Sequence, residues 1–202
     1  MNAMARSIIV CALVPLLLTA CGSSPPVRYF SLSSSVAAVG QDPEDSVALG
    51  FGPMRMPEYL NRSQLVTRGS GQEIEVDEFS RWAEPLSPAF HRIVSTDVDN
   101  AVDGLVVVAF PWESAVHAGV DYRLLGDVIR FDADRSGRVI LDVQWGVLKA
   151  SLREFVVRPQ RSRYEARTGS PGDPAAVASA MNDALAEFSR DIANEVEIAL
   201  EK

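Results

Sequence analysis

Residues 138–148 read RVILDVQWGVL, and this stretch decides the fold. Every second side chain is large and apolar: Val139, Leu141, Val143, Trp145 and Val147. Because successive side chains of a β-strand point to opposite faces of a sheet, this alternation predicts a strand with one buried face. A second strand-like run, residues 122–131, precedes it across residues 132–137. We therefore expect two antiparallel strands joined by a turn.

The C-terminal segment is predicted to form the helix that covers this buried face. Apolar residues recur at steps of three and four over residues 174–200, which is the pattern of an amphipathic helix. Asp173 fits an N-cap, and Pro174 fits the first helical position. The other face of the helix is acidic and is expected to be solvated, or else to repel anionic lipid headgroups. Its acidic residues are Asp183, Glu187, Asp191, Glu195 and Glu197.

Shorter patterns fill the rest of the chain. Apolar residues at helical spacing predict a medium helix over residues 86–102, and the run 105–110 is typical of a strand covered on both faces. Further strands are expected at residues 27–32, 47–56, 64–68, 73–79, 152–157 and 161–167, with a helical turn at 57–61. The sequence thus predicts one α/β domain, in which a medium helix and a long C-terminal helix pack on a mixed, mostly antiparallel sheet.

Composition excludes several classes of function. Of the 202 residues, 47% are hydrophobic and 23% are charged, as in an ordinary globular domain. The formal net charge of −8 argues against a nucleic-acid partner, because phosphate binding needs a basic surface. Both cysteines, Cys11 and Cys21, lie near the N-terminus, and His91 and His117 are the only histidines. We therefore expect no disulfide framework, no metal and no dissociable cofactor.

The N-terminus is typical of a secretory signal. Arg6 is followed by an apolar run of about 12 residues, too short to span a membrane and suited to a signal peptide. The sequence Leu18-Thr-Ala-Cys21 then resembles the lipobox of bacterial lipoproteins, in which the cysteine receives a diacylglycerol and, after cleavage, an N-acyl chain such as palmitate. The expected organisation is a signal peptide at residues 1–20, a lipidated tether at 21–26 and one domain at 27–202. Gly22, by the same resemblance, favours the periplasmic face of the outer membrane.

Several landmarks together resemble one known family. After Leu18-Thr-Ala-Cys21 come Tyr29-Phe-Ser-Leu32, Met56-Pro-Glu-Tyr-Leu60, Trp82-Ala-Glu-Pro-Leu86 and Gly137-Arg-Val-Ile-Leu-Asp-Val-Gln-Trp145, and then the amphipathic C-terminal helix. Their order and spacing are similar to those of the ABC-type transport auxiliary lipoproteins, which include the paraquat-inducible protein C lipoproteins. The resemblance extends over nearly the whole chain after the signal.

This resemblance implies a role without enzymatic activity. Such lipoproteins accompany mammalian-cell-entry (MCE) domain proteins, which form hydrophobic tunnels for lipid transfer between the two membranes and so support membrane integrity. The expected partners are an MCE tunnel protein, its inner-membrane permease and, through the lipid on Cys21, the outer membrane; a homo-oligomer is left open. The alternative is an outer-membrane assembly or lipid-carrying lipoprotein that works without a tunnel partner.

Four residues in two of these landmarks are candidates for partner binding. Tyr59 and Leu60 lie on the predicted turn, and Trp82 and Leu86 flank Pro85 at the start of the medium helix. Aromatic residues are enriched at protein interfaces, which favours a contact surface. The alternative is that the first pair fixes the turn to the core and the second holds the helix on the sheet. Both interpretations stay open at this stage, whereas Trp145 is expected to be core.

No catalytic residue is predicted. Ser95, His117 and Asp121 supply the residue types of a hydrolase triad. However, the sequence has no Gly-x-Ser-x-Gly segment to place a nucleophilic serine on a strand-to-helix turn. His91 follows Phe90 on the medium helix and is expected to be solvated or hydrogen-bonded near a helix end.

Overall fold

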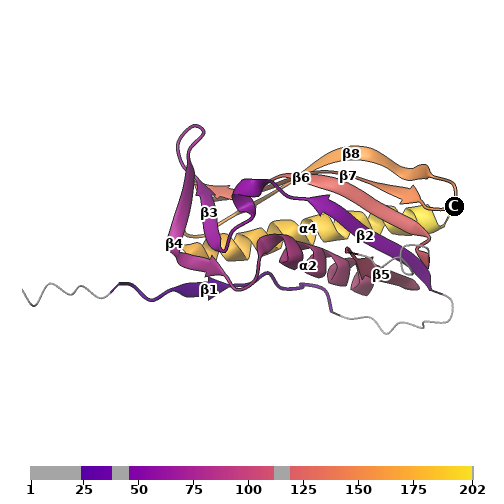
Figure 1. The fold of residues 1–202 in the computed structure, drawn as a ribbon, viewed down its shortest axis with the longest axis horizontal. Coiled ribbons are helices and arrows are strands. Elements are labelled where there is room, and N and C mark those ends of the chain that lie inside the picture. The colour runs from indigo at the N-terminus through magenta and orange to yellow at the C-terminus, as the bar shows by residue number, and fades with distance from the viewer. Residues whose placement is uncertain (1–23, 38–45, 112–118, 202) are drawn as a thin grey trace, which may run out of the picture.

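The strands form one sheet, and two helices pack on one of its faces (Figure 1). The computed structural model describes residues 24–37, 46–111 and 119–201. This part of the chain confirms the predicted fold class of a mixed sheet with a medium and a long helix. In chain order the elements are β1 (Arg28–Phe30), β2 (Val47–Arg55), the 3-10 turn η2 (Glu58–Leu60), β3 (Gln64–Arg68), β4 (Ile74–Trp82), α2 (Leu86–Ala101), β5 (Leu105–Ala109), β6 (Tyr122–Asp134), β7 (Arg138–Lys149), β8 (Glu154–Arg167) and α4 (Pro174–Leu200).

The long strand β6 organises the sheet. On one edge it pairs with β7 in an antiparallel ladder, and β8 continues the sheet antiparallel to β7. On the other edge β6 lies parallel to β2 near its start and parallel to β3 near its end. The resulting order through the described strands is β1-β4-β3-β6-β2-β5, with β7 and β8 extending from β6. The two longest ladders are antiparallel, as the sequence predicts, and the parallel pairings are shorter.

The β6–β7 hairpin forms as the alternation predicts. The apolar residues that alternate along β7, from Val139 to Val147, are all at most 1% exposed. The turn places Gly137 at φ 75°, a backbone conformation that glycine adopts without steric cost. The turn is shorter than expected, because β6 continues to Asp134. The carboxylate of Asp134 accepts hydrogen bonds from the backbone N–H groups of Ser136 and Arg138 and so closes the turn.

Helix α4 covers the buried side of β6, β7 and β8. The Asp173 side chain accepts a hydrogen bond from the Ala175 N–H, and Pro174 occupies the first turn, as predicted. The apolar face of α4 is buried along the whole helix. The residues of this face include Val177, Met181, Ala184, Leu185, Phe188, Ile192 and Val196. Helix α2 packs beside it against β2 and β5. Neither helix combines the length and hydropathy needed to cross a membrane.

Aromatic rings fill the centre of the core. Phe188 of α4 lies 5.9 Å, centroid to centroid, from both Phe90 of α2 and Trp145 of β7. Phe131 of β6 meets Phe90 edge to face at the same separation. Such packing adds to the hydrophobic stabilisation from burying the rings. The two helices and the sheet therefore share one core.

Three strand predictions need correction. Residues 152–157 and 161–167 do not form two strands, because β8 is continuous from Glu154 to Arg167. Strand β5 is not buried on both faces, because Leu105 is its one fully buried residue; among the described strands it pairs with β2. Strand β1 is three residues long rather than six. The predicted signal peptide and Cys21 lie outside the described residues.

Candidate functional site

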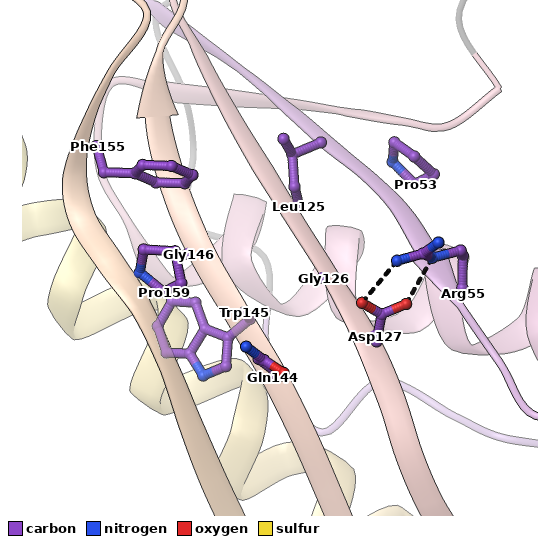
Figure 2. Close-up of a pocket in the computed structure, with 10 residues that line it drawn as sticks. All are labelled: Pro53, Arg55, Leu125, Gly126, Asp127, Gln144, Trp145, Gly146, Phe155 and Pro159. Atoms are coloured by element: carbon purple, nitrogen blue, oxygen red, sulfur yellow. Dashed lines mark hydrogen bonds and ion pairs between the residues drawn. The ribbon is translucent and has the colours of Figure 1, made fainter.

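The face of the sheet opposite α2 and α4, here called the open face, carries an apolar groove of about 400 Å³. The Leu125 side chain points to this face, because its neighbour Leu124 is buried under the helices. Gly146, which pairs with Leu125 and follows the buried Trp145, lies at the same face. In Figure 2, Leu125 from β6 and Phe155 from β8 both border the groove. It is lined by Pro53, Arg55, Leu125, Gly126, Asp127, Gln144, Trp145, Gly146, Phe155 and Pro159.

A glycine forms the floor of the groove under β8. A Cβ atom at Gly146 would lie 3.0 Å from the carbonyl oxygen of Val157 and 3.1 Å from the nitrogen of Pro159. The ladder between β7 and β8 also shifts register between Trp145 and Val147. The missing side chain lets β8 pass close to β7 there, and Pro159 then borders the groove.

One end of the groove is polar. The Arg55 guanidinium donates from Nε and Nη2 to the two carboxylate oxygens of Asp127, at 2.5 and 2.9 Å. The two residues are paired neighbours on β2 and β6. Their side chains are 80% and 40% exposed, so the ion pair contributes little to stability. It instead gives the apolar groove a charged rim (Figure 2).

Strand β8, which contributes Phe155 and Pro159 to the groove, also carries four basic residues: Arg158, Arg161, Arg163 and Arg167. Arg161 makes a bidentate ion pair with Asp142, at 2.8 and 2.7 Å, and this hydrogen bonding lowers the pKa of the Asp142 carboxyl. Of the strands that the structure describes, β8 pairs with β7 alone, so it is an edge strand of this sheet. Arginines and a proline on such an edge hinder pairing with another strand. The open face is therefore better suited to side-chain contact than to strand addition.

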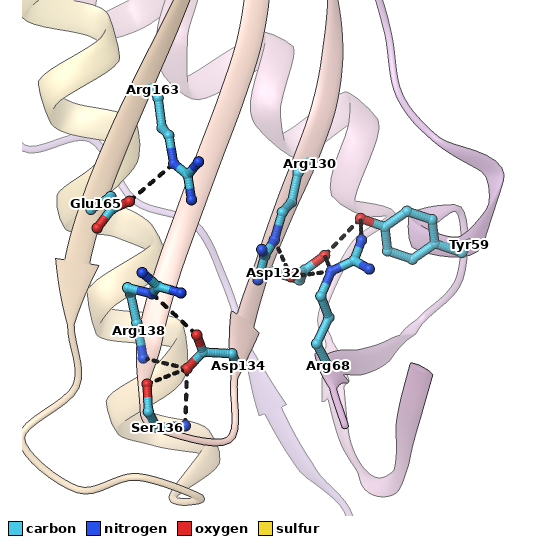
Figure 3. A network of polar contacts seen from close by, with 9 residues as sticks. All are labelled: Tyr59, Arg68, Arg130, Asp132, Asp134, Ser136, Arg138, Arg163 and Glu165. Carbon is cyan, nitrogen blue, oxygen red and sulfur yellow. Dashed lines mark hydrogen bonds and ion pairs between the residues drawn. The ribbon is translucent and has the colours of Figure 1, made fainter. Parts of the chain in front are cut away.

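A buried carboxylate joins the η2 turn to the sheet (Figure 3). The Asp132 side chain is fully buried and pairs with Arg68 at 3.0 Å and with Arg130 at 2.7 Å. The Tyr59 hydroxyl donates to the same carboxylate at 2.7 Å, and Arg68 donates to the hydroxyl oxygen at 3.2 Å. Burial, together with the Asp132 carboxylate, raises the pKa of Tyr59 to about 12. These contacts satisfy a charge that would be costly to bury alone.

A second polar cluster holds the end of the β6–β7 hairpin (Figure 3). Although burial opposes it, hydrogen bonds from Ser136 and Arg138 lower the pKa of Asp134 to about 2. Arg138 also forms an ion pair with Asp134 at 3.1 Å. Both clusters stabilise local structure at the same end of β6.

The four predicted partner-binding residues lie at different depths. Leu60, Trp82 and Leu86 are 2%, 5% and 1% exposed and belong to the core cluster. Tyr59 is half-buried, with its hydroxyl in the Asp132 network and the Arg68 guanidinium 5.5 Å from the ring centroid. A partner role for these four residues stays a prediction. In the folded chain a partner could contact mainly the exposed part of the Tyr59 side chain.

Replacing Tyr59 tests these alternatives. We expect Tyr59→Ala to lower the free energy of unfolding by about 2 kcal/mol or more, because the buried Asp132 carboxylate loses a hydrogen-bond donor. The melting temperature Tm should fall by about 4–8 °C. The measurement is thermal unfolding of a soluble chain that begins at residue 22. Tyr29→Ala is the matched control, because Tyr29 is 65% exposed and its loss should change stability by about 0.5 kcal/mol or less. An unchanged Tm for Tyr59→Ala would show that the turn does not depend on this anchor.

Of the histidine and triad residues that the structure describes, His91 and Asp121 make hydrogen bonds to the backbone, and the buried Ser95 hydroxyl has no hydrogen-bond partner among the described residues. His91 is buried rather than solvated, and it is hydrogen-bonded near the start of α2: its Nδ1 donates to the Ser87 carbonyl at 2.7 Å, and its Nε2 accepts from the Met54 N–H at 3.2 Å. Burial lowers the pKa of His91. Ser95 lies buried on α2, and Asp121 accepts from the Ala48 N–H. His117 lies outside the described residues.

The groove is a feature that the sequence reasoning missed. A signal was present in the consecutive leucines Leu124 and Leu125, because neighbouring strand residues face opposite sides and one of them must leave the helix-covered core. Among the described residues, no group of three His, Cys, Asp or Glu side chains is placed to hold a metal ion. The apolar lining of the groove and its charged rim are features of a surface that binds another molecule.

Comparison with known protein families identifies the family of this chain. Residues 30–193 match the profile of the family described as the ABC-type transport auxiliary lipoprotein component. The chain belongs to this family. The match includes all the residues that line the groove and all those of the Asp132 network. The family is one of transport auxiliary lipoproteins, not of enzymes, so the chain is a membrane-associated component that serves a transport system.

Two solved structures of other proteins have a similar fold. A crystal structure of a Xanthomonas campestris protein is similar with a TM-score of 0.69 and 20% identity, covering 86% of this chain and 97% of that one. A second crystal structure, of an uncharacterized protein, has a TM-score of 0.68 and 17% identity, covering 85% and 99%. A comparison with curated protein sequences gives no match. At these identities the structural similarity shows the fold alone.

Proposed function

We propose that this lipoprotein is anchored in the outer membrane through Cys21 and docks the tunnel protein of an MCE-type lipid transport system. Its contribution is binding and positioning, without catalysis. Family membership supports a transport role, and the short apolar segment before Leu18-Thr-Ala-Cys21 supports the lipid anchor. The MCE protein and its inner-membrane permease are the proposed partners.

The groove on the open face is the observation that carries the docking role. An apolar surface bordered by charged residues is the usual composition of a protein interface, with an apolar centre and a polar rim. Phe155 is 46% exposed at the edge of the groove, although most large apolar residues of the sheet are buried. An exposed aromatic side chain beside a groove can bury a large area against a partner.

A lipid-carrying role is the second candidate. A groove of about 400 Å³ is in the range of small-molecule sites. However, carriers enclose most of the ligand surface, whereas this groove is bordered by an exposed phenylalanine and an exposed ion pair. The exposed border favours contact with a protein surface over enclosure of an acyl chain.

Site-specific crosslinking distinguishes these functions. The photoreactive residue benzoylphenylalanine replaces Phe155 in the full-length lipoprotein, and the cells are irradiated before their membranes are analysed by mass spectrometry. The matched control carries it at Ile198 on α4, which is 49% exposed on the helical side. We expect an MCE-domain protein to be crosslinked from position 155 and not from position 198.

Each other product has a defined meaning. Crosslinking to lipid alone from position 155 would support the carrier function instead. Crosslinking to a second copy of the chain would place a homo-oligomer contact on the open face and contradict docking there. Capture of the MCE protein from position 198 alone would move the docking surface to the helices.

A further inference from the structure

Three exposed apolar side chains gather at the sheet edge formed by β1 and β4. Val27, Tyr29 and Phe79 are 38%, 65% and 41% exposed, and we call this group the edge patch. Strand β1 runs parallel to β4, with Tyr29 opposite Arg81. The order of the sheet makes β1 its last strand on this side. The patch is therefore on an outer edge of the molecule (Figure 1).

The alternation of β1 shows that the core does not use these side chains. Phe30 is opposite Trp82, and both pack against the core, as does the buried Leu32. Tyr29 precedes Phe30 by one residue, so its side chain points to the opposite face of the strand, away from the core, as does that of its partner Arg81 on β4. Two aromatic residues and a valine exposed together mark a contact surface more often than isolated exposed residues do.

The position of the patch in the chain restricts what can cover it. Val27 is six residues after Cys21, and an extended chain of that length spans at most about 20 Å. If Cys21 is lipidated, as the proposed function states, this edge stays within about 20 Å of the bilayer surface. A short tether also raises the effective concentration of the surface at the membrane, so weak apolar contacts suffice.

We propose that the edge patch inserts into the interface between headgroups and acyl chains of the membrane that holds Cys21. Tyrosine and other aromatic side chains concentrate in that interfacial layer, because it is apolar at one depth and hydrated at the next. The lipid and the patch then form two attachments, which fix the orientation of the domain instead of leaving it free on its tether.

The proposed contact is apolar rather than electrostatic, because the cations around the patch are paired with carboxylates. Arg81 forms an ion pair with Glu78, with Nη2 3.8 Å from Oε2, and Arg28 forms one with Asp173, with Nη1 3.6 Å from Oδ1. Glu75, near the start of β4, and Glu73, just before that strand, pair with Arg135. With the cations beside the patch matched by carboxylates, anionic lipid is not required, and the contact should form equally on a neutral phospholipid surface.

The orientation leaves the docking groove accessible. In Figure 1, β1 lies at the lower edge of the molecule near the start of the described chain, whereas β6, β7 and β8 lie at the upper edge. The residues that line the groove come from β2, β6, β7 and β8, and none of them belongs to the edge patch, so a membrane that contacts the patch uses other strands than the groove does. Membrane attachment and docking would use separate surfaces.

Tryptophan fluorescence in vesicles tests the proposal. The full-length lipoprotein carries Tyr29→Trp and, after mass spectrometry verifies the lipid on Cys21, is reconstituted in phosphatidylcholine vesicles with or without brominated acyl chains. The control is Leu152→Trp, because Leu152 is 62% exposed in the turn between β7 and β8, away from β1. We expect a blue shift and a loss of fluorescence on brominated lipid for Tyr29→Trp but not for Leu152→Trp, beyond the signal that the natural tryptophans give both variants.

Two results would overturn the proposal. Equal quenching of the two variants would show that the domain has no preferred side toward the bilayer. Quenching of Tyr29→Trp only when phosphatidylglycerol is added would show attraction by charge rather than apolar insertion. Since the vesicles contain no MCE protein, either outcome leaves the docking function untouched, and failure of docking leaves this measurement untouched.

Discussion

Phe188→Ala is expected to lower the free energy of unfolding by about 3–5 kcal/mol, because it removes a ring from the centre of the core. Phe188 has no exposed surface, and its ring contacts Phe90, Trp145 and Tyr164 at centroid distances of 5.9, 5.9 and 5.6 Å. These partners come from α2, β7 and β8. The cavity would therefore open where all layers of the fold meet, and little local collapse can fill it.

The neighbouring residue provides the control for this measurement. Glu187 is exposed one position earlier on the same helix, and Glu187→Ala should change stability by about 0.5 kcal/mol or less. Urea unfolding of soluble chains that begin at residue 22 gives both values from the midpoints. If the two variants lost the same stability, the assignment of the apolar face of α4 to the core would be wrong.

The helices could be predicted accurately because their signals are local. The predicted helix 174–200 coincides with α4, and the predicted 86–102 differs from α2 by one residue. In α4 the N-cap Asp173, the following Pro174 and a sustained helical period all indicate the same boundaries. Agreement among independent local preferences leaves few alternatives for such a segment.

Strand boundaries depend on partners that are distant in sequence, and the errors follow from this. Pro159 suggests a break between two strands, because it cannot donate a hydrogen bond. In the structure β8 continues through it, since β8 is an edge strand and has a ladder on one side only. The run 105–110 looks like a central strand, but which neighbours flank β5 is set by the order of the sheet and not by its own residues.

The site residues show the same limit. The hydrogen bond from Tyr59 to Asp132 joins residues 73 positions apart, and their meeting depends on β3 lying beside the end of β6. The sequence could identify Tyr59 as an aromatic residue on a turn but not the carboxylate that receives its hydroxyl. The groove likewise requires β2, β6, β7 and β8 to be adjacent, which no single pattern shows.

The two proposed contacts depend on different parts of the chain. The groove is built by strands in the second half of the sequence together with β2, whereas the edge patch belongs to β1 and β4. Substitutions more than about 10 Å apart with no shared partner usually act independently. Variants at Phe155 and at Tyr29 should thus separate partner binding from membrane orientation.

Cys21→Ser is expected to abolish membrane anchoring, because the hydroxyl does not replace the thiol that would accept the diacylglycerol. Each buried methylene contributes about 0.8 kcal/mol to membrane binding, and stable anchoring needs more than one acyl chain. Loss of the lipid should therefore leave an unprocessed or soluble chain. Incorporation of a fatty-acid probe, followed by fractionation of membranes, measures both effects in the same cells.

Cys11→Ser is the matched control, since Cys11 lies inside the apolar segment of the predicted signal and not at its cleavage site. It should keep the label and the membrane location of the unmodified chain. Each variant loses one thiol, so a difference between Cys21→Ser and Cys11→Ser depends on which position lost it. Equal labelling and equal membrane retention of Cys21→Ser and Cys11→Ser would contradict the lipid anchor, and the edge patch would then have no tether to hold it at a membrane.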